Sequence, residues 1–270
     1  MRTVPDGRIS NKRALVTGSS SGIGAAIARS LAQRGANLVL VARRKERLEA
    51  LAEELRTLDV EVLVHAADLT RSDAADQIFE TTEGAGLAVD ILVNNAGVGD
   101  YDPFIETPWD SIERQIQLNA VAVTKMCHLF APKMVERGTG QIMNVASIGA
   151  YTPTPLFAVY TSTKAYVRHL TEALDFELRG TGVRAICVNP GGTKSEFTSH
   201  SGQHVNAVGD RLMMTSERCA EIAVEKMIAG RRNVITGWMN AIGMWLLRFM
   251  PRSTYPALAH ATMSRAVDKV

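Results

Sequence analysis

Tyr160 and Lys164 are the two residues of this sequence whose types and spacing are best suited to chemistry. They are four residues apart in a stretch, 157–178, with apolar residues at helical spacing, so both would lie on one helix face. Free tyrosine has a pKa of about 10, and a nearby ammonium group lowers it by favouring the phenolate. The pair could therefore act as a general acid and base near neutral pH. The same spacing arises by chance in many helices, so other motifs must support this interpretation.

A glycine-rich turn near the N-terminus provides the first support. Residues 13–17 (RALVT) predict a strand, GSSSGIG occupies 18–24, a helix is expected from 22 to about 34, and a second strand covers 37–42. Glycines let the backbone approach a pyrophosphate, and the helix N-terminus offers free N–H groups and a positive dipole end. The unit therefore indicates nucleotide binding, with a merely tight strand–helix turn as the alternative.

The end of the second strand bears on the choice of cofactor. An acidic residue there would bind the ribose hydroxyls of NAD. This sequence instead has Ala42, Arg43, Arg44 and Lys45. Guanidinium groups suit the 2′-phosphate of NADP through charge-assisted hydrogen bonds. We therefore expect NADP(H) rather than NAD, although these cations could also be the solvated start of the next helix.

The rest of the chain continues the alternation of strands and helices. Further strands are predicted at 61–65, 89–93, 140–146, 182–188 and 233–236, and helices at 46–58, 73–83, 109–136 and 216–229. This alternation indicates right-handed crossovers and a parallel sheet.

Polar residues at strand ends and inside one helix are candidate site residues. Ligands bind at the carboxyl ends of strands in such sheets, and Ser147 lies just past the fifth strand. Asp68, after the third strand, could bind an adenine amino group or cap the next helix. Asn119 lies inside a predicted helix, where asparagine is unfavourable and needs a reason.

Composition excludes several classes of protein. The 270 residues are 46% hydrophobic, which suits one large α/β domain. The net charge of +2 is too small to indicate a nucleic-acid partner. Neither the three cysteines nor the six histidines show metal-binding spacing, and we expect no metal. Reduced thiols and the lack of a signal-peptide pattern predict a cytoplasmic location. The stretch 234–250 is too short and polar to predict a transmembrane span.

Taken in order, these motifs resemble the classical short-chain dehydrogenase/reductase family. The matching segments span about residues 10–236, and Ser147 precedes Tyr160 by 13 residues, as in the family pattern. The matching residues are TGSSSGIG at 17–24, Asp68, NNAG at 94–97, Asn119, Ser147, Tyr160, Lys164, Pro190 and Gly191. The resemblance implies a single-domain Rossmann-type fold, a doubly wound seven-stranded parallel sheet with helices on both faces.

The resemblance also implies catalytic roles for four residues. Tyr160 would exchange a proton with the substrate oxygen. Lys164 would lower the pKa of Tyr160 and hydrogen-bond the nicotinamide ribose. Ser147 would hold the substrate oxygen, and Asn119 would anchor a water that links Lys164 to solvent.

The cofactor-binding residues that the resemblance implies are spread along the chain. They are Gly18, Ser20, Ser21, Gly22, Ile23 and Gly24 in the glycine turn, Arg43 and Arg44 at the 2′-phosphate, Asp68 and Leu69 at the adenine, Asn95, Ala96 and Gly97 at the adenosine ribose, and Tyr160, Lys164, Pro190, Gly191, Thr193 and Ser195 at the nicotinamide end.

Three of these positions depart from the usual family pattern. Thr193 stands where an aliphatic residue is usual, and Ser195 stands where threonine is usual. Ser21 replaces a basic residue that some NADP-dependent members carry. We therefore expect Arg43 to contribute more to phosphate recognition, with Ser20 and Arg44 assisting.

The expected function is NADP(H)-dependent hydride transfer to or from the carbonyl or secondary alcohol of a hydrophobic small molecule. Segments 98–104, 148–157 and 197–214 would line the substrate pocket and are rich in apolar and aromatic residues. The weakly patterned segment 196–214 is expected to be a lid. The alternatives are an NAD-dependent alcohol or steroid dehydrogenase and a non-catalytic NADPH-binding regulator.

The C-terminal extension, 238–270, begins with an apolar stretch at 238–250. This stretch could extend the pocket, pack against another subunit, or rest on a membrane surface beside flanking arginines. By the family resemblance, the helices around Asn119 and Tyr160 would form the interface of a homodimer or homotetramer.

Overall fold

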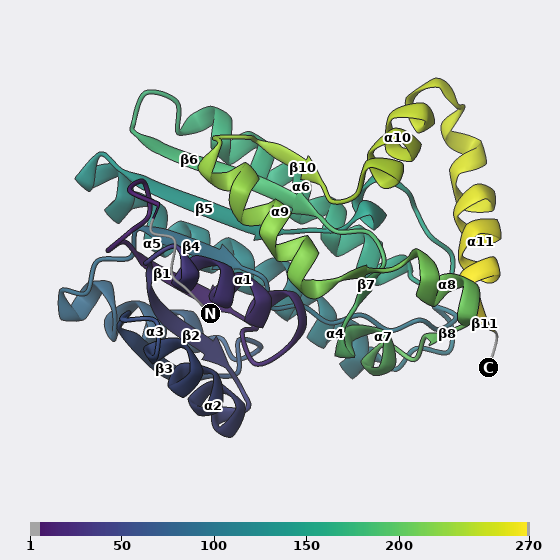
Figure 1. Ribbon diagram of the computed structural model, residues 1–270. Coiled ribbons are helices and arrows are strands. Elements are labelled where there is room, and N and C mark those ends of the chain that lie inside the picture. The colour runs from purple at the N-terminus through teal and green to yellow at the C-terminus, as the bar shows by residue number, and fades with distance from the viewer. Residues whose placement is uncertain (1–5, 269–270) are drawn as a thin grey trace.

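The computed structural model describes residues 6–268, and a seven-stranded parallel sheet forms its centre (Figure 1). The strand order is β10-β6-β5-β4-β1-β2-β3. Along the chain, strands are therefore added on one side of β1 as far as β3 and then on its other side from β4 to β10. Ligands bind at such a switch point in open α/β sheets. The strands are β1 (Arg13–Thr17), β2 (Asn37–Ala42), β3 (Val62–Ala66), β4 (Ile91–Asn94), β5 (Gly140–Val145), β6 (Val183–Asn189) and β10 (Asn233–Ile235). This confirms the predicted fold.

Helices cover both faces of the sheet. The first face holds α1 (Gly22–Gln33), α2 (Lys45–Arg56) and α9 (Ser216–Ile228), and the second holds α3 (Ala74–Glu80), α5 (Val123–Arg137) and α6 (Ala158–Glu177). Strand residues alternate between the two cores: Leu38 and Leu40 of β2 join the first, and Val39 and Val41 join the second. The strands are therefore apolar throughout because both faces are covered.

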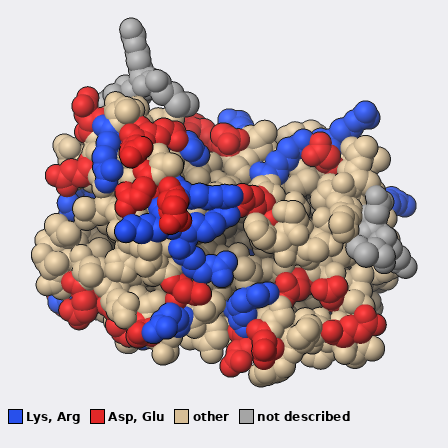
Figure 2. All heavy atoms as spheres, turned by 90° about the horizontal axis from the view of Figure 1, so that it is seen from below, with Lys and Arg blue, Asp and Glu red and all other residues tan. Residues whose placement is uncertain are grey.

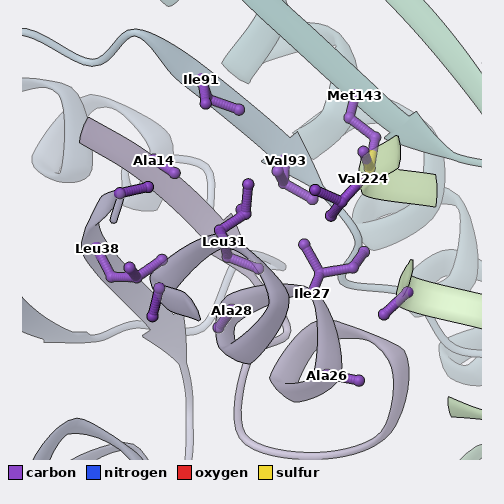
Figure 3. Packing of buried hydrophobic residues seen from close by; sticks show 14 of the residues in the cluster. Ala14, Ala26, Ile27, Ala28, Leu31, Leu38, Ile91, Val93, Met143 and Val224 are labelled. Carbon is purple, nitrogen blue, oxygen red and sulfur yellow. The ribbon is translucent and has the colours of Figure 1, made fainter. Parts of the chain in front are cut away.

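Helix α1 packs closely on the sheet beside α9. Ile27 and Leu31 are fully buried and point towards Val93 of β4 and Val224 of α9 (Figure 3). Burying a side chain of this size stabilises a fold by about 1.5–3 kcal/mol. This packing holds the N-terminus of α1 at the carboxyl end of β1.

The predicted helix 109–136 contains a change of geometry at its middle. It consists of α4 (Trp109–Ile116), a π-helical segment η2 (Gln117–Ala122) and α5. Such segments are rare and occur often at functional sites.

Helix α3 ends at Glu80, earlier than predicted, because the hydroxyls of Thr81 and Thr82 donate to carbonyls of the preceding turn.

The segment 196–214 is more regular than its weak pattern predicts. It contains α7 (Glu196–His200), β8 (His204–Val205) and α8 (Ala207–Leu212). Two further short strands, β7 (Thr193–Lys194) and β9 (Met214–Thr215), pair in parallel at its base. Thr215 caps α9 (Ser216–Ile228) by accepting a hydrogen bond from the N–H of Arg218 at 3.2 Å.

The C-terminal extension forms a helical hairpin beyond the carboxyl ends of the strands (Figure 1). It comprises α10 (Trp238–Leu246), the short turns η4 (Leu247–Phe249) and η5 (Arg252–Thr254), α11 (Tyr255–Ala266) and β11 (Val267–Asp268). Helix α11 was not expected from the sequence, and none of its residues is buried. Strand β11 pairs antiparallel with β8 and joins this hairpin to the segment 196–214.

The surface of the hairpin is strongly apolar on α10. Its large exposed side chains are Trp238, Met239, Ile242, Trp245 and Leu246. Among residues 6–268, no helix combines the length and hydropathy needed to cross a membrane.

Charged side chains of both signs are mixed elsewhere on the surface. One face carries a central group of Lys and Arg with Asp and Glu beside it (Figure 2), as the small net charge predicts.

Candidate active site

Hydrogen bonds between Thr17 and Asn95 join the carboxyl ends of β1 and β4. The hydroxyl oxygen of Thr17 accepts from the N–H groups of Asn95 and Ala96, at 3.0 and 3.1 Å. In return, Nδ2 of Asn95 donates to the carbonyl of Thr17 at 3.0 Å. Residues 95–97, expected at the adenosine ribose, are therefore fixed beside the glycine turn.

The glycine turn is tight at two positions. Gly18 has a φ of +68°, which favours glycine, and a Cβ on Gly24 would lie 2.3 Å from the carbonyl oxygen of Gly18. Ser21 directly precedes α1, and among the described residues no side chain makes a capping hydrogen bond at the N-terminus of this helix. The first N–H groups of α1 are therefore available to an anion, as a pyrophosphate site requires.

Arg44 lies against this turn and is already engaged. Its Nη2 donates to the hydroxyls of Ser20 and Ser21, at 3.0 and 2.8 Å. Its Nη1 donates to the carboxylate of Glu196 at 2.7 Å, and Arg47 pairs with the other oxygen of that carboxylate. The side chain of Arg43 is exposed and makes no hydrogen bond or ion pair with any residue between 6 and 268. The contact with Glu196 is one that the sequence did not reveal.

The residues expected to be catalytic converge at the carboxyl end of β5. Lys164 is 4% exposed, and its Nζ donates to the carbonyl of Val145, the last residue of β5, at 2.8 Å. The same Nζ lies 5.8 Å from the ring centroid of Tyr160. Ser147 follows two residues after Val145, and its Oγ accepts from the N–H of Gly149 at 3.1 Å.

Burial has opposite effects on the charges of Tyr160 and Lys164. It raises the pKa of Tyr160 to about 12, against an opposing hydrogen bond with Ser147. Burial also lowers the pKa of Lys164 to about 8. Burial has the largest influence on this pKa of Tyr160 because desolvation disfavours the phenolate. The expectation that Lys164 lowers the pKa of Tyr160 stays a prediction. Tyr160 is strongly held in its protonated, proton-donating form.

Asn119 occupies the π-helical segment and is fully buried. Its Oδ1 accepts from the N–H of Val98 at 2.9 Å, and its Nδ2 donates to the carbonyl of Val98 at 2.8 Å and to the hydroxyl of Thr163 at 3.0 Å. These bonds are the structural reason for an asparagine inside a helix. A Cβ built on Gly97 would lie 3.2 Å from both Oδ1 of Asn119 and Nζ of Lys164, so the two polar groups are neighbours.

Aromatic rings pack against the ring of Tyr160. The ring centroid of Phe157 is 4.5 Å away and that of Phe197 is 5.2 Å away, and Tyr101 packs edge-on against Phe157 at 5.6 Å. Tyr101 and Phe157 were predicted pocket residues, and Phe197 was the first residue of a predicted wall. The surroundings of the Tyr160 ring are therefore apolar.

Other predicted residues make different contacts. The hydroxyl of Tyr151 donates to Asn233 at 3.0 Å, and its ring lies under the guanidinium of Arg168, so this residue packs away from the ring cluster. Asp68 accepts from the backbone N–H and hydroxyl of Thr70, at 3.0 and 2.8 Å, and does not cap α3.

The residues expected at the nicotinamide end lie directly after β6. Thr193 donates from its hydroxyl to the carbonyl of Gly191 at 3.0 Å, and Ser195 accepts from the N–H of Phe197 at 3.3 Å. Asn240 of α10 lies against Gly191, where a Cβ would be 2.1 Å from its Nδ2. The C-terminal hairpin therefore touches the predicted cofactor site.

Three residues that make these contacts were not predicted from the sequence, namely Glu196, Arg47 and Thr163. The position of Thr163, directly before Lys164, was the only sequence signal for its role. Among residues 6–268 the structure contains no cluster of metal-ligating side chains.

A family model described as short chain dehydrogenase matches residues 12–206. This match covers most of the sheet, the glycine turn and all four predicted catalytic residues. The chain belongs to the short-chain dehydrogenase family. Membership makes it an oxidoreductase, and it confirms the resemblance drawn from the motifs.

Individual relatives are similar over most of their length. An uncharacterized oxidoreductase of Myxococcus xanthus is 30% identical over 93% of this chain and 97% of its own. The 17-beta-hydroxysteroid dehydrogenase type 3 of Mus musculus is 33% identical over 85% of this chain and 75% of its own.

Solved structures are similar in fold as well as sequence. A short-chain dehydrogenase from Sphingobium yanoikuyae in complex with NADPH has a TM-score of 0.79 and 31% identity, covering 90% of this chain and 97% of its own. A 3-ketoacyl-(acyl-carrier-protein) reductase from Brucella melitensis complexed with NADH has a TM-score of 0.76 and 28% identity, covering 84% of this chain and 97% of its own.

Proposed function

We propose that this protein is an NADP(H)-dependent oxidoreductase that transfers a hydride between nicotinamide and the carbonyl or secondary alcohol of an apolar small molecule. The observation that carries the proposal is the placement of buried Tyr160 and Lys164 beside Ser147, at the carboxyl end of β5. A nicotinamide cofactor is supported by the glycine turn and by similar structures that hold NADPH or NADH.

Recognition of NADP(H) rests on Arg43 and Arg44. Arg44 is held at the glycine turn by the hydroxyls of Ser20 and Ser21, where a 2′-phosphate could receive charge-assisted hydrogen bonds. Arg43 is exposed and has no acidic partner among the described residues. In this proposal the turn and both arginines bind the adenosine half of the cofactor.

Proton transfer is assigned to Tyr160. The nicotinamide supplies the hydride when bound. Tyr160 donates its proton to the carbonyl oxygen of the substrate during reduction and takes it back during oxidation. Ser147 orients that oxygen through its hydroxyl. Lys164 contributes a buried ammonium that can donate both to the phenolate of Tyr160, formed when Tyr160 gives up its proton, and to the cofactor ribose. Asn119 holds the backbone at 97–98 beside Lys164.

The substrate proposed is apolar because of the rings beside Tyr160. Phe157, Phe197 and Tyr101 present carbon surface, and the mouse relative is named as a steroid dehydrogenase. Excluding water from this region also strengthens the hydrogen bonds made to the reacting oxygen.

The test is NADPH oxidation by purified protein with a panel of apolar ketones and aldehydes, with NADH as the comparison cofactor. Turnover is expected with NADPH, and Tyr160→Phe is expected to abolish it while leaving NADPH binding within about twofold of the wild type. Near-normal turnover by Tyr160→Phe would disprove the assigned role. NADPH binding without turnover, with every carbonyl in the panel, would favour the regulator instead.

Cofactor choice is tested separately. Arg43→Asp and Arg44→Gln are each expected to weaken NADPH binding about tenfold or more and to change NADH binding little. An NAD-dependent dehydrogenase is the second candidate, because Glu196 already occupies Arg44 and the Brucella relative holds NADH. If Arg43→Asp and Arg44→Gln changed the binding of NADPH and NADH equally, the NAD-dependent dehydrogenase would be favoured.

Assembly into a homodimer or homotetramer is part of the proposal. The helices around Asn119 and Tyr160 expose large apolar side chains, namely Ile116, Val121, Tyr166 and Phe176. Multi-angle light scattering of the purified protein should give at least twice the 29.3 kDa chain mass. Val121→Glu should lower that mass, and a monomeric wild type would contradict the proposal.

A further inference from the structure

Glu196 holds the two cations nearest the glycine turn. Its carboxylate accepts from Nη1 of Arg44 at 2.7 Å and pairs with Arg47 through its other oxygen. Hydrogen bonds from Arg47 and Arg44 lower the pKa of Glu196 to about 2, so it is charged at every physiological pH. The side chains of Arg44 and Glu196 are each 37% exposed and that of Arg47 is 50% exposed, so each contact is weak enough to exchange with a competing anion.

The next residue connects this ion pair to the catalytic tyrosine. Phe197 follows Glu196 in the short helix α7, and its ring lies 5.2 Å from the ring of Tyr160. The other end of α7 is attached by the N–H of Tyr101, which donates to the carbonyl of Ser201 at 2.8 Å. One short helix therefore contacts the proposed 2′-phosphate site and also covers Tyr160.

We propose that Glu196 is an internal competitor for the 2′-phosphate of NADP(H), and that its displacement from Arg44 and Arg47 releases α7 and uncovers Tyr160. This inference rests on the proposed function only in assuming that a 2′-phosphate binds at Arg44. A phosphate dianion carries more charge and more acceptor oxygens than one carboxylate, so it can replace Glu196 on the same guanidinium groups. Once phosphate is bound, like-charge repulsion disfavours the return of Glu196.

The proposal makes Glu196 a specificity-determining residue. A cofactor without the 2′-phosphate leaves Glu196 on Arg44, and α7 stays over Tyr160. A cofactor with the phosphate must first break the Glu196 contacts, which lowers its affinity but opens the substrate side. Affinity for the phosphate and mobility of α7 are therefore linked through one side chain.

The first experiment is calorimetric titration of the full chain with 2′,5′-ADP and with 5′-AMP, which differ only in the 2′-phosphate. Glu196→Gln removes the competing charge and keeps the size of the side chain. It is expected to tighten binding of 2′,5′-ADP by about three- to tenfold and to leave 5′-AMP unchanged. An unchanged or weaker preference for 2′,5′-ADP in Glu196→Gln would overturn the proposal.

Asp210→Asn is the matched control. Asp210 belongs to the same 196–214 segment and pairs with Lys194 at 2.6 Å, but it contacts neither arginine. This variant loosens the segment without freeing Arg44, so its preference between the two nucleotides should equal that of the wild type. The same gain in Asp210→Asn as in Glu196→Gln would show that loosening alone is the cause and would also overturn the proposal.

The second experiment is hydrogen exchange of the peptide covering 196–205. In the wild type, 2′,5′-ADP should speed exchange there and 5′-AMP should not, whereas Glu196→Gln should exchange fast without nucleotide. Protection by 2′,5′-ADP would contradict release of α7.

Failure of the proposed function looks different. A wild type that prefers 5′-AMP, with a Glu196→Gln variant that gains affinity for 2′,5′-ADP, would reject the NADP assignment and keep the role of Glu196.

Discussion

The side-chain amide of Asn119 donates a hydrogen bond to the hydroxyl of Thr163, the residue directly before Lys164. The hydroxyl of Thr163 in turn donates to the carbonyl of Tyr160 at 2.8 Å. The π-helical segment and helix α6, which carries Tyr160 and Lys164, are therefore joined through two buried side chains. This connection holds the backbone of α6 in register with residues 97–98.

Thr163→Val should weaken this connection. Valine keeps the shape of threonine but removes the acceptor for Asn119 and the donor to Tyr160. We expect the free energy of unfolding to fall by about 1–2 kcal/mol and turnover to fall more than cofactor binding. Urea denaturation and steady-state kinetics measure both effects. Thr163→Ser keeps the hydroxyl and is the control; equal losses in the two variants would rule out the hydrogen bond as the cause.

Asn119→Asp should be more harmful. The substitution replaces a donor that serves Val98 and Thr163 by an acceptor, and it places a charge at a fully buried position. We expect the free energy of unfolding to fall by roughly 3 kcal/mol or more. Asn240→Asp, which loses only one bond, to the carbonyl of Thr236, should cost clearly less. Similar urea midpoints for the two variants would contradict this account.

Gly99→Ala tests the packing around Tyr160. A Cβ at Gly99 would lie 2.8 Å from Cδ2 of Tyr160 and 3.1 Å from Cζ of Phe197, so both rings must shift. Overpacking of this kind costs about 1–3 kcal/mol, and turnover should fall with it. Gly243→Ala in α10 meets no atom within 4 Å and should instead stabilise the protein by about 0.5–1 kcal/mol. Thermal unfolding distinguishes the two directions, and stabilisation by Gly99→Ala would disprove the contact.

Lys164 should make stability depend on pH in the alkaline range. Burial lowers its folded-state pKa from 10.5 to about 8, so between these values the unfolded chain binds more protons. The contribution of Lys164 to the free energy of unfolding therefore rises with pH from about 8 to 10.5 and is constant below pH 8. Lys164→Met lacks this change.

The measurement is urea denaturation of both proteins at pH 7, 8, 9 and 10. Because other groups titrate alike in both, the stability of Lys164→Met minus that of the wild type should decrease steadily above pH 8. A difference that stays constant across this range would mean that Lys164 keeps an ordinary pKa.

Much of the fold was predictable because local patterns in the sequence indicate it. Apolar runs predicted the sheet strands to within two residues, since strands covered on both faces must be apolar throughout. The motif order predicted the family and which residues meet at the carboxyl edge. Gly18 and Gly24 could be recognised because only glycine fits a turn of that tightness.

The tertiary structure decided what depends on contacts between distant segments. No local pattern shows that Glu196 meets Arg44, 152 residues earlier in the chain, or that Phe197 lies on Tyr160. The π-helical segment at Asn119 follows from bonds to Val98 and Thr163, and the direction of the Tyr160 pKa follows from burial. Sequence determined the identity and order of the chemical groups, because motifs are local. Charge state and pairing were decided by folding, because desolvation and proximity exist only once the chain is packed.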